Sequence, residues 1–356
     1  MNLDSVLGEG DTPLVPLDRL ARRWGLGGLW AKCEHLNPTG SYKDRIAAAS
    51  MKSAVDRGLR GWIATSSGNG GAAMAAYGRR AGLTGVLCVQ SGAPAEKLAS
   101  IRPYDVLMLE VPGMGPAVMD ELERIAAATR LLLTITTHRH NPVGMQGADA
   151  IGTEILRAQP AVTQVYVPCG GGGLLVATAR GLTTARQASH HGTGSGPAVV
   201  ASQPAGCAPI ALAADGRLDR PVVAECTTAI SGLQLAEPPD GDAATAAVRK
   251  SGGWGTVVTD EETWHAQDLL AREEGLFVEP AAAVPLAAMA ADAAAGRIGP
   301  DDQVAVVLTG HGLKDLHRYT TAKAPLEVCG TDELGTRIGR HLGNDNAPTT
   351  SAGATR

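Results

Sequence analysis

One lysine occupies a stretch of sequence that favours nucleophilic chemistry. Lys43 lies between the segment Asn-Pro-Thr-Gly at residues 37–40 and an alanine run at residues 47–49. The proline and glycine favour a turn, and the hydroxyl of Thr39 or Ser41 can cap a helix, so Lys43 is expected in a first helical turn. The positive end of the helix dipole disfavours the ammonium form there, which favours the free amine that forms an imine. A solvated surface lysine is the simpler alternative.

A second loop carries hydroxyl and amide side chains. Residues 65–71 read Thr-Ser-Ser-Gly-Asn-Gly-Gly and lie between an apolar run and an alanine-rich run. Such a turn directs several backbone N–H groups and hydroxyls to one point, which suits an anion such as a carboxylate. Taken alone, an ordinary strand-to-helix turn explains this loop almost as well.

Four consecutive glycines form a third loop, namely Gly170, Gly171, Gly172 and Gly173. They cost backbone entropy, which indicates close approach by another group, and a phosphate at a helix N-terminus is the natural occupant. The next expected strand ends at Ser202 and Gln203 without the acidic residue of a dinucleotide fold, and no Gly-Lys-Ser/Thr follows the glycines. The pattern therefore favours a phosphate site without a nucleotide signature.

A threonine follows another apolar run. Thr309 stands after residues 304–308 and before the segment Gly-His-Gly at residues 310–312. In a parallel sheet, ligands bind at the carboxyl ends of the strands, so the Thr309 side chain is expected near a ligand. Simple β-propensity at a strand end is the alternative explanation.

The elements that must position these loops alternate between short apolar runs and alanine-rich stretches. Strands are expected at residues 62–64, 86–89, 106–109 and 131–133, with helices at residues 72–81, 96–101 and 116–129. A second series has strands at residues 164–167, 198–201, 256–258 and 304–308, with helices at residues 174–188, 262–274 and 281–294. This alternation predicts an α/β fold with parallel sheets covered by helices on both faces.

The domain organisation follows from the two series. We expect a small N-terminal α/β domain at residues 34–142 and a larger phosphate-binding α/β domain made of residues 1–33 and 143–330. Residues 331–356 are rich in small and polar residues and are expected to be a disordered tail.

Composition excludes several classes of protein. The chain has 356 residues, 19% of them charged, and a net charge of −5 without a basic stripe, which argues against nucleic-acid binding. No apolar run or leader predicts a membrane span or export, so a cytoplasmic location is expected. The six cysteines are scattered and are expected to be buried thiols in a reducing compartment. The histidines lack partners at ligand spacing, so no metal site is expected.

The four loops, in this order, resemble the motifs of the pyridoxal-phosphate-dependent enzymes of fold type II, the tryptophan synthase β-like family. Residues 37–45 resemble the pyridoxal-lysine motif, residues 66–69 the substrate-carboxylate loop, and residues 170–173 the cofactor-phosphate loop. The form Pro-Thr-Gly-Ser-aromatic-Lys-Asp-Arg, with residues 274–281 and 308–315, is most similar to threonine synthase. The similarity runs from about residue 11 to residue 316, and four motifs in order are far more specific than one.

The resemblance implies two open parallel-sheet domains with pyridoxal 5'-phosphate in the cleft between them, and a homodimer acting on a small amino acid. It assigns Lys43 as the Schiff-base lysine and acid/base, and Asn141 to the substrate. It assigns binding of the substrate carboxylate to Ser66, Ser67, Asn69 and the Gly70 amide. For the cofactor, it assigns the ring hydroxyl to Asn69, the pyridine nitrogen to Thr309, and the phosphate to Gly170, Gly171, Gly172 and Gly173. A neutral hydroxyl on the pyridine nitrogen makes the ring a weaker electron sink, which favours elimination and replacement over transamination.

Some positions differ from the threonine synthase pattern. Gly144 stands where that family has an arginine after Asn-Pro, Ala282 replaces a serine, and the tetraglycine is closer to serine/threonine dehydratases. Lys97, Arg102 or Arg139 could supply a substitute cation. The best prediction is a threonine-synthase-like lyase acting on O-phosphohomoserine. The alternatives are a serine/threonine dehydratase, a β-replacement synthase making a non-proteinogenic amino acid, and, in another class, a non-catalytic phosphate- or nucleotide-binding module.

Overall fold

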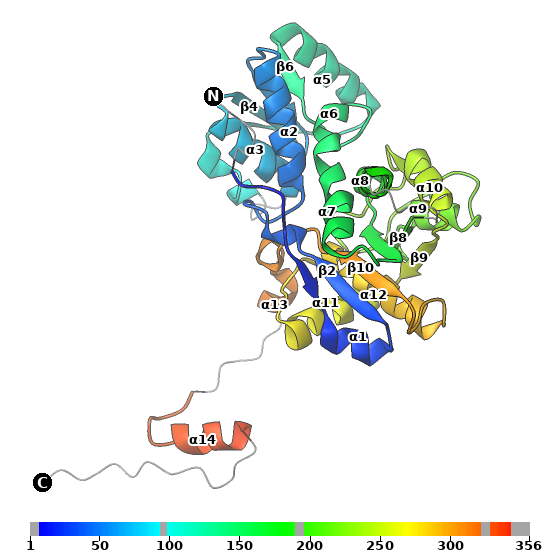
Figure 1. Ribbon diagram of the computed structural model, residues 1–356. Helices are drawn as coiled ribbons and strands as arrows, with labels where there is room; N and C mark the ends of the chain where they lie inside the picture. The colour runs from blue at the N-terminus through cyan, green and yellow to red at the C-terminus, as the bar shows by residue number, and fades with distance from the viewer. Residues whose placement is uncertain (1–6, 93–97, 189–195, 322–327, 343–356) are drawn as a thin grey trace, which may run out of the picture. The chain divides into compact units, whose positions relative to one another are not determined.

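The computed structural model describes residues 7–92, 98–188, 196–321 and 328–342. The chain forms two compact units, Met1–Asp315 and Leu316–Arg356 (Figure 1). The first unit contains both sheets found in the described residues, one built from residues 61–133 and one from residues 14–32 and 164–307. The predicted α/β fold class is confirmed, whereas the exact domain boundaries stay a prediction.

The smaller sheet is parallel and has the order β5-β4-β3-β6. Its strands are β3 (Gly61–Ala64), β4 (Thr84–Gln90), β5 (Leu107–Val111) and β6 (Leu131–Leu133). The helices around it are α2 (Lys43–Asp56), α3 (Asn69–Arg80) and α5 (Pro116–Thr129). Trp62 packs in the core with residues of α2 and α3, while its neighbour Ile63 packs with residues of α5. Successive side chains of a strand point to opposite faces, so the sheet is covered on both sides.

The larger sheet has the order β1-β2-β10-β7-β8-β9, with only the edge strand β1 antiparallel. Its strands are β1 (Leu14–Pro16), β2 (Gly28–Lys32), β7 (Gln164–Pro168), β8 (Ala198–Pro204), β9 (Gly255–Val258) and β10 (Gln303–Val307). Val304 packs with helices α1 (Asp18–Trp24), α11 (Asp260–Glu274) and α12 (Pro280–Ala294), whereas Ala305 packs on the opposite face.

The other helices that the structure describes in full within the first unit connect the sheets or cover the second face of the larger one. They are α6 (Pro142–Gln146), α7 (Ala150–Ala158), α8 (Gly173–Ala188), α9 (Pro209–Ala214) and α10 (Gly241–Lys250). Short 3-10 turns occur at η1 (Glu34–Leu36), η2 (Arg102–Tyr104), η3 (Gly147–Asp149) and η4 (Gly312–Lys314). The helix expected at residues 96–101 lies partly outside the described residues, as does Lys97.

The second unit differs from the expected disordered tail. It contains α13 (His317–Thr321) and α14 (Leu334–His341), and α14 lies inside residues 331–356. Leu334 and Ile338 recur at a spacing of four residues, and Glu333 pairs with Arg337 at 3.0 Å, also four residues apart. Pairs at this spacing lie on one helix face and stabilise a local helix, which polar composition alone does not predict. Residues 343–356 lie outside the described part of the chain.

Two cysteines correct the expectation of free thiols. Cys207 and Cys226 form a disulfide across 19 residues. The backbone explains their approach, because Thr227 N donates to Gly206 O at 2.8 Å and brings the two segments together. Cys33, Cys88 and Cys169 are free and buried, as expected, and Cys329 is partly exposed.

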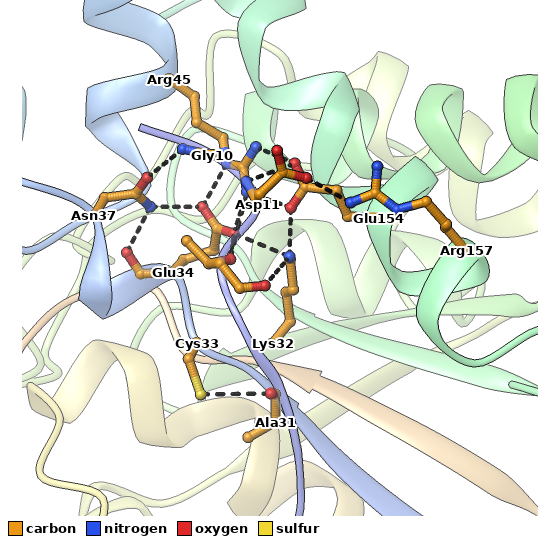
Figure 2. A network of polar contacts seen from close by, with 11 residues as sticks. Gly10, Asp11, Ala31, Lys32, Cys33, Glu34, Asn37, Arg45, Glu154 and Arg157 are labelled. Carbon is orange, nitrogen blue, oxygen red and sulfur yellow. Dashed lines mark hydrogen bonds and ion pairs between the residues drawn. The ribbon is translucent and has the colours of Figure 1, made fainter. Parts of the chain in front are cut away.

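A buried ion network connects the helix that begins at Lys43 to the larger sheet (Figure 2). Arg45 on α2 contacts Glu34 of η1 and Glu154 of α7, each at 2.7 Å. Lys32 at the end of β2 pairs with the same Glu154 and donates to the Thr12 carbonyl at 2.7 Å. All four charged side chains are almost completely buried, so they hold α2, α7 and β2 in a fixed arrangement.

The opposite charges of this network stabilise one another in their ionised forms. Burial by itself would raise the pKa of Glu154, but hydrogen bonds and charge interactions with Arg45 and Lys32 lower it to about 2. Burial also disfavours the Arg45 guanidinium, yet its bonds to Glu34 and Glu154 raise its pKa. Two cations therefore face two carboxylates, and each buried charge has a partner.

Two kinds of feature are not found in the described residues. None of their helices is both long enough and apolar enough to cross a membrane. No three of their His, Cys, Asp and Glu side chains gather in a way that could hold a metal ion.

Candidate active site

Lys43 is the first residue of α2, as the turn chemistry before it predicts. Its Nζ donates a hydrogen bond to the Thr136 hydroxyl at 3.0 Å and lies 4.7 Å from the centre of the Tyr42 ring. Lys43 is partly buried, and Thr136 lies in the loop after β6. The lysine amine is thus held between two segments of the small sheet region that are 93 residues apart.

The turn before Lys43 is fixed by polar contacts. Thr39 N donates to the Asp44 carboxylate at 2.6 Å, and the Thr39 hydroxyl contacts the same carboxylate. Gly40 has a φ of 84°, which favours glycine. Burial raises the pKa of Asp44 to about 6, against the lowering effect of the Thr39 hydrogen bonds. Lys314 donates to the Thr39 carbonyl at 2.6 Å and thereby joins η4 to this turn.

Thr309 follows β10 and lies against the lysine motif. Tyr42 N donates to the Thr309 carbonyl at 3.1 Å, and Ser41 forms an antiparallel bridge with Gly310. Thr309 is buried. The carboxyl end of β10 therefore meets the segment immediately before Lys43, although the two are far apart in sequence.

The loop at residues 65–71 opens α3, which begins at Asn69. Asn69 Nδ2 donates to both carboxylate oxygens of Glu279 at 3.0 Å, so the residue before α12 orients the Asn69 amide. A Cβ at Gly70 would lie 3.8 Å from the Thr136 methyl group. Thr136 thus touches Lys43 on one side and approaches this loop on the other. Ser66 and Ser67 are partly buried in the same loop.

The tetraglycine segment lies between β7 and the start of α8. A Cβ at Gly170 would lie 2.5 Å from the Gly232 carbonyl oxygen, and one at Gly172 would lie 2.9 Å from the Asp240 carbonyl oxygen. Gly172 also has a φ of 88°. The group that lies close to the Cα atoms of these glycines is therefore the protein's own segment 232–240. The first backbone N–H groups of α8, which have no partner within the helix, remain suited to an anion.

His138 and Asp240 form a pair at the start of α8. His138 N donates to the Asp240 carboxylate at 3.1 Å, and the ring Nδ1 lies 3.2 Å from Asp240 Oδ2. A Cβ at Gly173 would lie 2.8 Å from that same oxygen. The loop after β6 therefore reaches the tetraglycine segment through His138 and Lys43 through Thr136.

Asn141 has a structural task in this arrangement. Its Oδ1 accepts from Gly144 N at 3.1 Å and caps α6, and its Nδ2 donates to Ser50 Oγ at 2.7 Å. A side chain at Gly144 would overlap both Ser50 and Asn141. The assignment of Asn141 to substrate stays a prediction, and its side-chain amide already uses one donor and one acceptor position within the protein.

His311 and His35 lie next to each other behind the Thr309 turn. The ring centres are 5.8 Å apart, and His311 Nδ1 accepts from Leu313 N at 3.1 Å. Burial, with a smaller effect of His311, lowers the pKa of His35 to about 4, so His35 is neutral at neutral pH. Both rings therefore support the turn, because His311 caps the backbone that follows it and His35 packs against His311.

The sequence predicted four of these segments but not the two side chains, Thr136 and His138, that join them. Lys43, the Ser66–Gly70 loop and Thr309 are linked through Thr136, Tyr42 and Glu279, and the tetraglycine is linked to the same loop through His138. Thr136 and His138, which the sequence did not indicate as site residues, lie in the loop after β6. Its position at a strand's carboxyl end was the available signal, because that edge of a parallel sheet holds the ligand.

Comparison with known proteins shows which family the chain resembles. Residues 6–310 match the family model described as pyridoxal-phosphate dependent enzyme. The chain is 34% identical to a threonine synthase of Halalkalibacterium halodurans, over 90% of this chain and 87% of that protein. It is 32% identical to a threonine synthase of Methanosarcina acetivorans, over 86% of this chain and 76% of that protein.

Solved structures show the same fold. A threonine deaminase isoform 2 from Solanum lycopersicum has a TM-score of 0.72 at 21% identity, over 87% of this chain and 82% of that one. A serine racemase from Dictyostelium discoideum has a TM-score of 0.70 at 22% identity, over 85% of this chain and 92% of that one. The chain thus has the fold of the type II pyridoxal-phosphate enzymes.

This chain belongs to the pyridoxal-phosphate dependent enzyme family. Three predictions from the sequence are confirmed, namely the family, the pyridoxal 5'-phosphate cofactor and the class of cofactor-dependent lyase. The residues fit the cofactor, because a partly buried lysine amine and a glycine segment that opens a 16-residue helix are present. The role of each individual residue belongs to the proposal below.

Proposed function

We propose that this enzyme eliminates or replaces a side-chain group of a small L-amino acid, with O-phosphohomoserine as the best candidate substrate and threonine as the product. Similarity to threonine synthases at 30–34% identity over most of the chain supports this substrate. The observation that carries the proposal is the Lys43 amine held by Thr136 beside the loop that opens at Ser66. That arrangement supports a proton-transferring role for the Lys43 amine and a carboxylate-binding role for the neighbouring loop.

The chemistry divides among these residues in a simple way. When bound, the cofactor draws electrons from the substrate's α-carbon, which eases loss of a proton and departure of a side-chain group. Lys43 anchors the cofactor and moves the carbon-bound protons. Ser66, Ser67, Asn69 and the Gly70 amide bind the substrate carboxylate, and Asn69, oriented by Glu279, also binds the cofactor's ring hydroxyl. Gly170 to Gly173 hold the cofactor phosphate through backbone amides, and Thr309 binds the pyridine nitrogen. Asn141 is the proposed contact to the substrate's side chain.

A second candidate is dehydration of serine or threonine. It is favoured by Gly144, where the surrounding Ser50 and Asn141 leave no room for a side chain. One bidentate arginine–phosphate pair is worth roughly 1.5–3 kcal/mol, so its absence weakens recognition of a phosphorylated substrate about ten- to a hundredfold. Arg139 is exposed and makes no ion pair within the described residues, and could offset part of this loss. We also propose that the enzyme is a homodimer located in the cytoplasm.

The substrate is tested by steady-state turnover. O-phosphohomoserine is expected to give threonine and phosphate, while O-phosphoserine, O-acetylserine, serine and threonine react more slowly. Product formation is followed by chromatography for all five amino acids at equal concentration.

The outcomes separate the candidates. Turnover of serine or threonine to an oxo acid, without threonine formation from O-phosphohomoserine, would replace the first reaction by the second. Reaction of none of the five, in protein that carries the cofactor, would contradict both.

The phosphate role of the tetraglycine segment predicts a loss of cofactor affinity in Gly172→Ala. Gly172 has a positive φ, and a Cβ there would press on the Asp240 carbonyl, so the segment must shift. A strained residue of this kind costs roughly 1–3 kcal/mol, so affinity should fall about tenfold or more. Spectral titration of the cofactor-free protein with pyridoxal phosphate measures this affinity.

Gly216→Ala is the matched control for this experiment. Gly216 also has a positive φ, of 72°, but a Cβ there meets nothing within 4 Å, and it lies in the turn after α9. It should lower stability and leave cofactor affinity unchanged. Equal affinities in the two variants would remove the phosphate role from Gly172.

A further inference from the structure

Three threonines follow β6, and their hydroxyls have different partners. Thr134 Oγ1 donates to the Ile63 carbonyl at 3.1 Å, and Thr137 Oγ1 pairs with His140 Nδ1 at 2.7 Å. Thr134 thus bonds to the backbone of β3, and Thr137 bonds within the loop itself. Thr136 instead accepts a hydrogen bond from Lys43 Nζ at 3.0 Å. The loop therefore presents one hydroxyl to the reacting amine.

The Thr136 hydroxyl still has its own proton to give. A hydroxyl has one donor and two acceptor positions, and Thr136 uses an acceptor position for Lys43. Among the residues that the structure describes, Thr136 donates no hydrogen bond. Its methyl group faces Gly70, so the side chain lies between the lysine and the proposed carboxylate loop. A group in this place can accept a proton on one side and release one on the other.

We propose that Thr136 relays a proton from Lys43 to the leaving-group oxygen of the substrate. This assignment rests on the proposed elimination and adds a catalytic residue to it. Lys43 takes a proton from a substrate carbon and becomes an ammonium. The ammonium then passes a proton to Thr136 Oγ1 as the original Thr136 hydroxyl proton moves to the leaving oxygen.

The relay balances without another reactant. The electron pair of the broken carbon–hydrogen bond becomes the new carbon–carbon double bond, and the pair of the broken carbon–oxygen bond departs with the oxygen. The proton removed from carbon is replaced on the leaving group, so Lys43 and Thr136 return to their starting states. Protonation matters because hydroxide and fully ionised phosphate are poor leaving groups without it.

Thr136→Val tests this assignment, because valine keeps the shape and removes the hydroxyl. Thr136→Ser keeps the hydroxyl and should restore the activity. Thr134→Val is the matched control, since it removes a neighbouring hydroxyl that serves only the backbone of β3. Each variant is measured as the complete chain with its cofactor.

Paired substrates distinguish the relay from a general loss of structure. O-phosphohomoserine is compared with 2-amino-4-chlorobutanoate, and serine with 3-chloroalanine, because chloride leaves without a proton. Thr136→Val should lose about a hundredfold or more on the oxygen substrate that wild-type protein uses, and keep its rate on the chloride partner. Proton exchange from the substrate carbon into heavy water, followed by NMR, should continue, because Lys43 still removes the proton.

The outcomes that would contradict the relay differ from the one that would contradict the proposed function. Equal losses on the oxygen and chloride substrates, or no rescue by Thr136→Ser, would overturn the relay while the proposed reaction stands. A similar loss in Thr134→Val would assign the effect to the loop. No turnover of any of the four substrates by the wild-type protein would contradict the proposed function and the relay with it.

Discussion

Lys43→Ala is expected to abolish covalent attachment of the cofactor and nearly all turnover. Lys43 is the amine at the start of α2 that contacts Thr136, and it is the proposed anchor of the family's cofactor. Loss of one positioned acid/base group alone costs roughly a hundred- to ten-thousandfold in rate, and this variant also loses the proposed anchor. The visible spectrum after removal of free cofactor, with and without borohydride reduction, measures attachment.

Lys52→Ala provides the matched control on the same helix. Lys52 is exposed and pairs with Asp56 at 2.9 Å, one turn further along α2. Its removal should change neither the spectrum nor turnover. If Lys43→Ala kept a lysine-bound band that borohydride reduces, another lysine would have to be the anchor.

The second large effect concerns stability. Arg45→Met should strongly destabilise the protein, because it leaves Glu34 and Glu154 buried with a single remaining cation, Lys32. Breaking a buried ion pair by removing one partner costs roughly 3–5 kcal/mol, or a decrease of roughly 5–10 °C in the melting temperature of a protein of this size. Thermal unfolding monitored by circular dichroism measures the change.

Arg157→Met is the control for this stability effect. Arg157 pairs with Asp11 at 2.5 Å, but both side chains are mostly exposed. Exposed pairs contribute at most about 1 kcal/mol, so the melting temperature should hardly move. A shift as large as that of Arg45→Met would show that burial does not decide the cost.

The pH dependence of the network has a definite sign. The pKa of Glu154 is lowered from 4.5 to about 2 in the folded protein, so its ionised form stabilises the fold above about pH 4.5. That stabilisation is lost as the pH falls from about 4.5 towards 2. The melting temperatures of wild-type protein and Glu154→Gln should therefore converge over this range. A constant difference across it would contradict the assignment to Glu154.

The sequence predicted the local parts of this protein because their signals lie within a few residues. The turn before Lys43 follows from Pro38 and Gly40, and the glycines before α8 predict a helix start where an anion can bind. The alternation of strands and helices predicted the α/β fold for the same reason. The similarity of these motifs to known families then gave the cofactor and the class of reaction.

The tertiary structure alone decided which groups meet. Lys43 and Thr136 are 93 residues apart, His138 and Asp240 are 102 apart, and Asn69 and Glu279 are 210 apart. No periodicity or turn signal encodes such pairs, because they depend on strand order and register in two sheets. The ion network of Arg45 and Glu154 and the Cys207–Cys226 disulfide arise in the same way, from backbone segments that become neighbours only after folding.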